Sequence, residues 1–552
     1  MARINDLPNN VLRLILYYAA ATPANWLSEW KAKLPLVAVC RRWSKLARNL
    51  VFYQVYVELT TLPWSSILPF AYSNTRPFWT SNAELLISRG CILAAGCLTI
   101  ELADRITPEC LRSIALEILQ LDRIDWQRIN ALTITGPSKV HEYSKYIAET
   151  EEASEGDIAC AMQYFAQNVR NVVGLKLAYP ESGSRGNYIC GSLATLYGGQ
   201  LQIHRELYSP SLGFVDFSRN IRVLELTLGS KAARVLPSIC GETLKVLKFY
   251  NIPHNFAWHH FRYDIFVRPI VFHRLTILYL DFKYSDMELT ENEIQDKTVS
   301  GVHNCDQLSF LALKQLSIRN CTPDCDLFYA DLPFPELKNV YLCGSVNSIR
   351  HCCRLKLTWV RDLHVDVFTN NLSDATDFYG VTNHLFTNIR IGRAAVLNVC
   401  STKFILDPEL IRWVNLTHLS IARVDYTAIC KSVGRLPNLA EFLINNLEFD
   451  NTATDRFSAD SLLFNSADPM LAWGAKLTRL FMCELYMDYS VSVCVGGIQA
   501  LILHAGALKT LSVPESTEQL ILEFIDVNKD RHPHLANIQL DWGRNFFYPV
   551  YS

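Results

Sequence analysis

A short apolar motif recurs along most of the chain, with Leu, Ile, Val, Phe or Met at its first, fourth and sixth positions. Side chains alternate between the two faces of a β-strand, so the fourth and sixth positions point to one side and their flanking residues to the other. We therefore expect each copy to be a short strand that buries two side chains. Repetition of the motif predicts a stacked array, because each unit covers the apolar face of its neighbour.

The copies of the motif continue to the end of the sequence. From Leu224 onward, successive fourth positions lie 23 to 38 residues apart, except for a gap between Leu363 and Leu419. Regular repeats keep about 20–29 residues, so the longer intervals predict insertions or helices, and periodicity favours helices over 113–121 and 157–169. The fourth and sixth positions are Leu98/Ile100, Leu132/Ile134 and Leu175/Leu177 in weaker copies, then Leu224/Leu226, Leu247/Phe249, Leu278/Leu280, Leu316/Ile318, Val340/Leu342, Leu363/Val365, Leu419/Ile421, Phe442/Ile444, Leu480/Met482, Leu511/Val513 and Ile538/Leu540.

The first fifty residues follow a different pattern, with apolar side chains at the spacing of two amphipathic helices. The first helix carries them at positions 7, 11, 12, 15, 16 and 19, and the second at 36, 39, 40, 43, 46 and 50. Pro23 interrupts the linker between them, 22–33. So small a unit buries little surface by itself, and we expect some of these side chains to complete their burial on another protein.

Leu7-Pro8, Val11-Leu12 and Ile15-Leu16, followed by Leu36, Val39-Cys40-Arg41-Arg42-Trp43 and Val51-Phe52-Tyr53, resemble the F-box motif over about residues 4–55. The resemblance implies a small helical domain that binds a Skp-type adaptor and, through it, a cullin ubiquitin ligase. The linker 22–33 is several residues longer than the family pattern. The adaptor-binding residues implied by the resemblance are Leu7, Pro8, Val11, Leu12, Ile15, Leu36, Val39, Cys40 and Trp43.

The recurring strand motif resembles the leucine-rich repeat, and Cys321 occupies the Asn/Cys position of that consensus, where a packed thiol is expected. The resemblance implies an α/β solenoid with a parallel sheet on its concave face and helices on its convex face. Together the two resemblances divide the chain into three segments. They are an F-box-like helical domain over 1–55, a connecting segment over 56–91, and an irregular leucine-rich-repeat solenoid over 92–552.

Residues that flank the buried strand positions are expected on the open face of the predicted sheet. Tyr, Arg, His, Asp and Phe predominate among them, a composition that protein interfaces favour. An ordinary solvated sheet face is the alternative for any single residue, so the surface as a whole carries the hypothesis. The candidate client-binding residues are Lys248, Tyr250, Tyr279, Asp281, Arg319, Tyr341, His364, Asp366, His418, Arg479 and Phe481.

Composition narrows the class of protein further. The 552 residues include 52 basic and 54 acidic side chains, and a net charge of −2 gives no global electrostatic case for nucleic acid or anionic membranes. Half of the residues are hydrophobic, too many for a disordered chain. Asp6 and Pro8 precede any apolar run, so we expect no secretory signal and a cytoplasmic and/or nuclear protein. The 17 cysteines lack paired metal-ligand spacing, which predicts buried thiols and no cofactor.

The sequence contains none of the phosphate-binding, metalloprotease or nucleophile-elbow motifs that would indicate an enzyme. We therefore expect a non-catalytic specificity subunit, which holds a client protein so that a ubiquitin-conjugating enzyme acts on it at high effective concentration. The alternative is a leucine-rich-repeat binding scaffold that takes no part in ubiquitination, with residues 1–55 serving as a helical cap.

Overall fold

The computed structural model describes most of the repeated strands and several helices, together with Leu12 near the N-terminus. By its internal contacts the chain divides into two compact units, Met1–Pro253 with Trp258–Leu275, and His254–Ala257 with Thr276–Ser552. Each unit is α/β, with a large parallel sheet and helices. Apart from a few positions inside these ranges, the described residues are 54–59, 79–81, 96–136, 151–178, 185–207, 220–227, 242–252, 270–283, 308–321, 334–368, 375–388, 394–399, 407–448, 476–485 and 491–541.

The sheet of the first unit places its strands in the order β2–β1–β3–β4–β5–β6–β7–β8, with parallel pairing except for the antiparallel β1–β2 pair. Leu98, Leu132 and Leu175 are in register with one another and buried, which confirms the predicted alternation. The strands of this unit are β1 Gln54–Leu59, β2 Trp79–Ser81, β3 Cys97–Glu101, β4 Ala131–Thr135, β5 Gly174–Ala178, β6 Ile203–Leu207, β7 Val223–Thr227, β8 Val246–Ile252 and β9 Ile270–Phe272.

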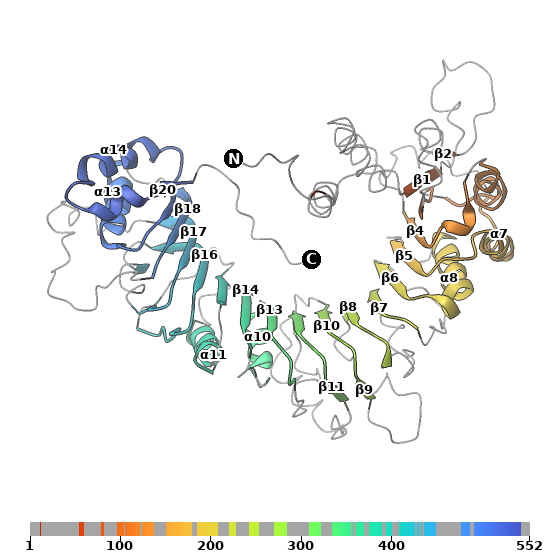
Figure 1. Cartoon of the computed structure of the whole chain (residues 1–552), viewed down its shortest axis with the longest axis horizontal. Helices are drawn as coiled ribbons and strands as arrows, with labels where there is room; N and C mark the ends of the chain where they lie inside the picture. Colours follow the sequence, from red (N-terminus) through yellow and green to blue (C-terminus); the bar gives the residue numbers. More distant parts are fainter. Residues whose placement is uncertain are drawn as a thin grey trace, which may run out of the picture. The chain divides into compact units, whose positions relative to one another are not determined.

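Helices of the first unit lie along one face of its sheet (Figure 1). The helices predicted over 113–121 and 157–169 are both confirmed, although the first begins five residues earlier and the second two residues earlier than expected. The helical segments are α6 Pro108–Arg112, which continues as η3 Ser113–Glu117 and η4 Ile118–Gln120, then η5 Trp126–Arg128, α7 Glu155–Asn168, α8 Arg185–Tyr197 and η7 Gly198–Gln200.

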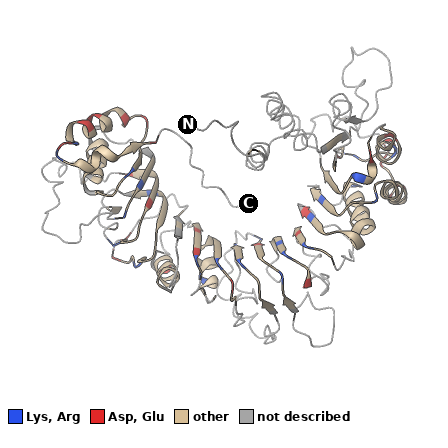
Figure 2. Cartoon of the chain, in the orientation of Figure 1, with Lys and Arg blue, Asp and Glu red and all other residues tan. Residues whose placement is uncertain are grey.

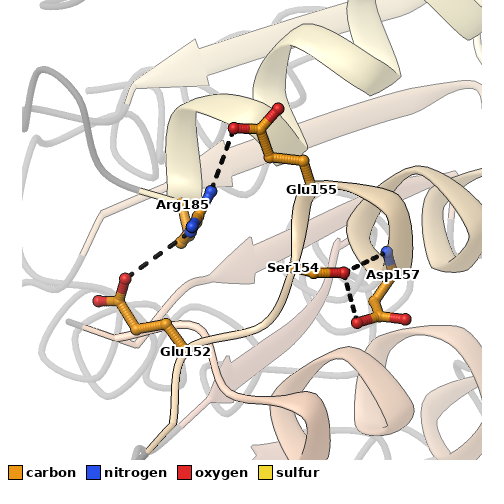
Figure 3. A network of polar contacts seen from close by, with 5 residues as sticks. All are labelled: Glu152, Ser154, Glu155, Asp157 and Arg185. Atoms are coloured by element: carbon orange, nitrogen blue, oxygen red, sulfur yellow. Dashed lines mark hydrogen bonds and ion pairs between the residues drawn. The ribbon is translucent and has the colours of Figure 1, made fainter.

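A polar network at the start of α7 explains where that helix begins (Figure 3). Ser154 is the N-cap, and its Oγ accepts a hydrogen bond of 3.1 Å from the backbone N–H of Asp157. Arg185, at the start of α8, lies 3.7 Å from Glu152 and 3.3 Å from Glu155. A capping hydroxyl contributes about 1 kcal/mol to stability, whereas exposed ion pairs such as these contribute about 0–1 kcal/mol, so the cap sets the helix start.

The sheet of the second unit is parallel throughout, in the order β10–β12–β13–β14–β15–β16–β17–β18–β19–β20. The strands of the second unit are β10 Ile277–Phe282, β11 Leu308–Phe310, which lies outside this sheet, β12 Gln315–Arg319, β13 Asn339–Ser345, β14 Asp362–Phe368, β15 Ala394–Val399, β16 His418–Asp425, β17 Glu441–Glu448, β18 Arg479–Leu485, β19 Thr510–Ser512 and β20 Gln539–Leu540. Its helices are α10 Val346–Cys352, α11 Ala375–Asn388, α13 Val491–His504, α14 Glu518–Asn528 and η15 Pro533–Asn537.

A row of apolar side chains crosses the second sheet and is buried along its length as far as Leu511. Cys321 lies just after β12 and is only 3% exposed, which confirms its predicted role as a packed thiol. The apolar row consists of Leu280, Ile318, Leu342, Val365, Leu397, Leu419, Phe442, Leu480, Leu511 and Leu540.

Six of the described strands, β1, β2, β6, β9, β11 and β15, lie where the motif did not predict them, and three of these are informative. β1 spans the boundary placed between residues 55 and 56 and pairs with β3, so the sheet begins well before residue 92. β15 occupies the gap after Leu363 and carries Ala395 where a larger apolar residue would reveal the motif. β6 turns His204 and Glu206 toward the core. Among the described residues, no helix has both the length and the apolar character that a membrane crossing requires.

Candidate functional site

Almost all of the residues expected to bind an adaptor lie outside the described part of the chain. The exception is Leu12, which is helical and has no exposed area, so it contributes to the packing of the chain itself. The residues that lie outside the described part are Leu7, Pro8, Val11, Ile15, Leu36, Val39, Cys40 and Trp43.

Strand register gathers most of the candidate client-binding residues into two neighbouring rows on the face of the second sheet opposite the apolar row. Figure 2 shows charged residues of both signs interspersed along these strands. The first polar row is Tyr279, Ser317, Tyr341, His364, Val396, His418, Glu441, Arg479, Thr510 and Gln539. The second polar row is Asp281, Arg319, Cys343, Asp366, Asn398, Ser420, Leu443, Phe481 and Ser512.

Side chains of the two polar rows pack against one another, which leaves some of them little area for a partner. Tyr279 and Phe481 are each only 9% exposed, so they mainly support their neighbours. The Arg319 guanidinium donates a hydrogen bond of 3.3 Å to the Tyr279 hydroxyl. Burial raises the pKa of Asp281, and the nearby Arg319 charge partly opposes that shift. Tyr279, Asp281 and Arg319 therefore form a half-buried polar group on β10 and β12.

Asp366 holds together an aromatic group on β13 and β14. The Tyr341 hydroxyl donates to one oxygen of the Asp366 carboxylate, and His364 Nε2 lies 2.7 Å from the other. The Tyr341 and His364 rings lie 5.0 Å apart between centroids. One carboxylate therefore fixes two aromatic side chains from neighbouring strands, which reduces the conformational entropy that a partner would have to remove on binding.

Cys343 completes this cluster and was missed by sequence reasoning, which treated the cysteines as core filling. It lies on β13 in the second polar row, within hydrogen-bond reach of Tyr341 and Arg319. Burial raises the pKa of the Cys343 thiol, so the thiol stays protonated near neutral pH and lacks the thiolate that a nucleophile needs. Its position two residues after Tyr341, on the same side of the strand, was the available signal.

A second carboxylate, that of Glu441 on β17, links two more of the predicted residues. Arg479 Nη1 lies 2.8 Å from Glu441 Oε1, and His418 Nε2 lies 3.6 Å from the same oxygen. The nearby His418 side chain, supported by the Arg479 charge, lowers the pKa of Glu441, and burial partly opposes that shift. Sequence reasoning missed Glu441, although it directly precedes a buried motif position, as His418 and Arg479 do.

Lys248 and Tyr250 lie on β8 in the first unit, where a basic group surrounds Glu225. The Glu225 carboxylate lies 3.5 Å from both Arg205 and Lys248. Lys176 is in register with Arg205 on the preceding strand. Arg205 was not predicted because β6 carries no recognisable motif. Lys176 and Glu225 were missed although each stands between the two buried positions of a motif copy.

No family model matches this chain, and no curated protein matches it significantly. Among the described residues, no group of three or more His, Cys, Asp or Glu side chains could hold a metal ion. The interactions that this site offers are hydrogen bonds, ion pairs and aromatic contacts.

Proposed function

We propose that this chain is the substrate-recruiting subunit of a Skp–cullin–F-box ubiquitin ligase. Its N-terminal segment, which resembles an F-box, would bind the adaptor, and the two polar rows would bind a client protein. In this proposal the parallel ladder is an irregular leucine-rich-repeat solenoid. The observation that carries the proposal is the array of Tyr, His, Arg and Asp side chains in register on β12 to β14 and β16 to β18, interrupted at β15 by Val396.

The geometry of the polar rows supports a binding role over a catalytic one. Tyr and Arg are the residues that most often dominate binding energy at protein interfaces. Asp366 and Glu441 hold such side chains in place before any partner arrives. The buried Cys343 thiol is kept protonated by its raised pKa, which suits a packed residue better than a reactive one.

Replacement of Tyr341 by Ala is expected to reduce client capture at least about tenfold, because a preorganised aromatic anchor contributes 2 kcal/mol or more at many interfaces. Affinity purification with quantitative mass spectrometry from cells that express wild type or variant would measure the change. Tyr164→Ala is the matched control, since Tyr164 is 46% exposed on α7 and lies outside the polar rows. Equal loss with both variants would contradict a role for the polar rows.

The adaptor half of the proposal predicts that Trp43→Ala abolishes co-purification of a Skp-type adaptor, because the resemblance places Trp43 at the adaptor contact. The full chain, wild type and variant, would be compared in a pull-down with the purified adaptor. Clients that are normally degraded should accumulate on the Trp43→Ala bait. Adaptor binding by both proteins to the same extent would remove the F-box assignment.

A binding scaffold that never joins a ligase is the second candidate, and one observation favours it. Leu12 is fully buried within the chain, as a residue of a helical cap would be. The scaffold predicts that client capture depends on Tyr341 while the adaptor binds neither wild type nor variant. The two experiments together therefore separate the candidates.

A further inference from the structure

A cavity of about 980 Å³ in the second unit lies at the starts of β18, β19 and β20. The Lys509 N–H donates to the Thr478 carbonyl at 2.9 Å, and the Gln539 N–H donates to the Lys509 carbonyl at 2.8 Å. These backbone bonds hold the lining residues of neighbouring strands about 4.8 Å apart. The cavity wall therefore has a fixed spacing of side chains.

The lining of this cavity is basic. Lys476, Arg479 and Lys509 all line it, together with His534. Among the described residues that line the cavity, none is Asp or Glu. Even with His534 neutral, the lining carries three positive charges.

The positive charge of the cavity is only partly balanced by its surroundings. Arg479 pairs with Glu441, which also lies near His418 and does not line the cavity. Lys476 Nζ donates at 2.6 Å to the neutral side-chain oxygen of Asn438. In the part of the chain that the structure describes, Lys509 forms no ion pair. An anionic ligand would thus meet at least two cations, Lys476 and Lys509, that form no ion pair with a described carboxylate.

We propose that this cavity binds an acidic segment, a run of Asp and Glu side chains, on the client protein. This inference names a feature that the client protein would carry. It rests on the proposed function, because the acidic segment belongs to that client. The cations belong to two neighbouring strands and the residues before them, an arrangement that suits several carboxylates along an extended peptide. In such a peptide, side chains on one side repeat about every 6.6–7 Å. The volume also suits a ligand larger than one anionic group.

The test uses the full chain and fluorescence anisotropy with a labelled peptide of alternating Asp and Glu. The control is an amide copy of this peptide, in which Asn replaces Asp and Gln replaces Glu, so that it keeps the shape but not the charge. We expect the acidic peptide to bind at least about tenfold more tightly than this copy at about 0.15 M salt. We expect Lys509→Glu to lower its affinity about tenfold or more, because it replaces a charge-assisted contact by repulsion.

Lys338→Glu is the matched control. Lys338 and Lys509 both follow the first apolar residue of a motif copy and directly precede a strand, and both are exposed. The control should bind the acidic peptide within about twofold of wild type, since a charge this remote from the cavity is largely screened. Lys476→Gln, which removes one charge without reversing it, should give an intermediate loss, and thermal unfolding midpoints would show that all variants fold.

Equal binding of the acidic and the amide peptides would overturn the proposal, as would an equal loss with Lys338→Glu and Lys509→Glu. A third peptide, the amide copy with a single phosphoserine, tests the competing ligand. Binding of that peptide alone would replace the acidic segment by a phosphate. These results leave the Trp43→Ala and Tyr341→Ala experiments untouched, so failure of the cavity proposal and failure of the proposed function are distinguishable.

Discussion

Replacement of Trp413 by Ala is expected to lower the free energy of unfolding by about 3–5 kcal/mol, the range for removing a large buried aromatic side chain. Trp413 lies between β15 and β16 and has no exposed area. Its ring stacks on Tyr379 of α11 with centroids 5.9 Å apart and meets the edge of Phe378 at 6.0 Å. The substitution therefore removes the packing that holds α11 against this part of the second unit.

The indole N–H adds a polar component to this loss. Trp413 Nε1 donates a hydrogen bond of 3.0 Å to Thr382 Oγ1, and the Thr382 hydroxyl donates in turn to the Phe378 carbonyl at 2.8 Å. Thr382 is fully buried, so an Ala at position 413 leaves its oxygen with one acceptor position unfilled. Trp413→Phe, which keeps an aromatic ring but not the N–H, should cost less than Trp413→Ala.

Urea unfolding of the full chain, followed by circular dichroism, would measure both variants. Trp126→Ala is the control, because Trp126 is only partly buried and its Nε1 bonds the carbonyl of Leu119 at a helix end in the first unit. A Trp413→Ala midpoint no lower than that of the control would show that the aromatic cluster does not stabilise the second unit.

The sequence predicted most of the strands in which two large apolar residues stand two positions apart, although it missed β1, which buries Val55 and Val57. That pattern works because inward side chains must fill a shared core. It failed at β15, where Ala395 faces Leu363 across the ladder and the apolar row continues through Leu397. Small residues satisfy a core whose neighbours are large, yet they leave no apolar signal.

The face of the sheet that each candidate residue occupies could be predicted, but its neighbours could not. Aligning motif copies places His364 beside Ser420, because each follows the fourth position of its motif. In the structure His364 shares the first polar row with His418, since Val365 rather than Leu363 continues the row that reaches Leu419. The pairings of Tyr341 with Asp366 and of Arg479 with Glu441 depend on such registers, which a single sequence does not reveal.

His204 and Glu206 offer a second large and testable effect, because they stand at inward positions that the neighbouring strands fill with leucine. On either side of β6, Leu175 and Leu224 are in register with His204. His204 has no exposed area, Glu206 is 6% exposed, and the His204 Nε2 lies 3.5 Å from a Glu206 oxygen. The Cys190 thiol of α8 lies close enough for the Glu206 charge to add to burial in raising the pKa of Cys190 to about 12.

His204→Leu alone is expected to destabilise the chain by about 3–5 kcal/mol, because it removes one polar partner of the buried Glu206 carboxylate. The double variant His204→Leu with Glu206→Leu restores the apolar ladder on β6 and should unfold within about 1 kcal/mol of wild type, or at higher urea. The difference between the double variant and the sum of the two singles measures the coupling of the pair. Ile203→Leu, at an exposed position of the same strand, controls for a change in strand propensity. A double variant as unstable as the two singles added together would mean that each side chain stabilises the core independently, and that the pair does not act as one buried unit.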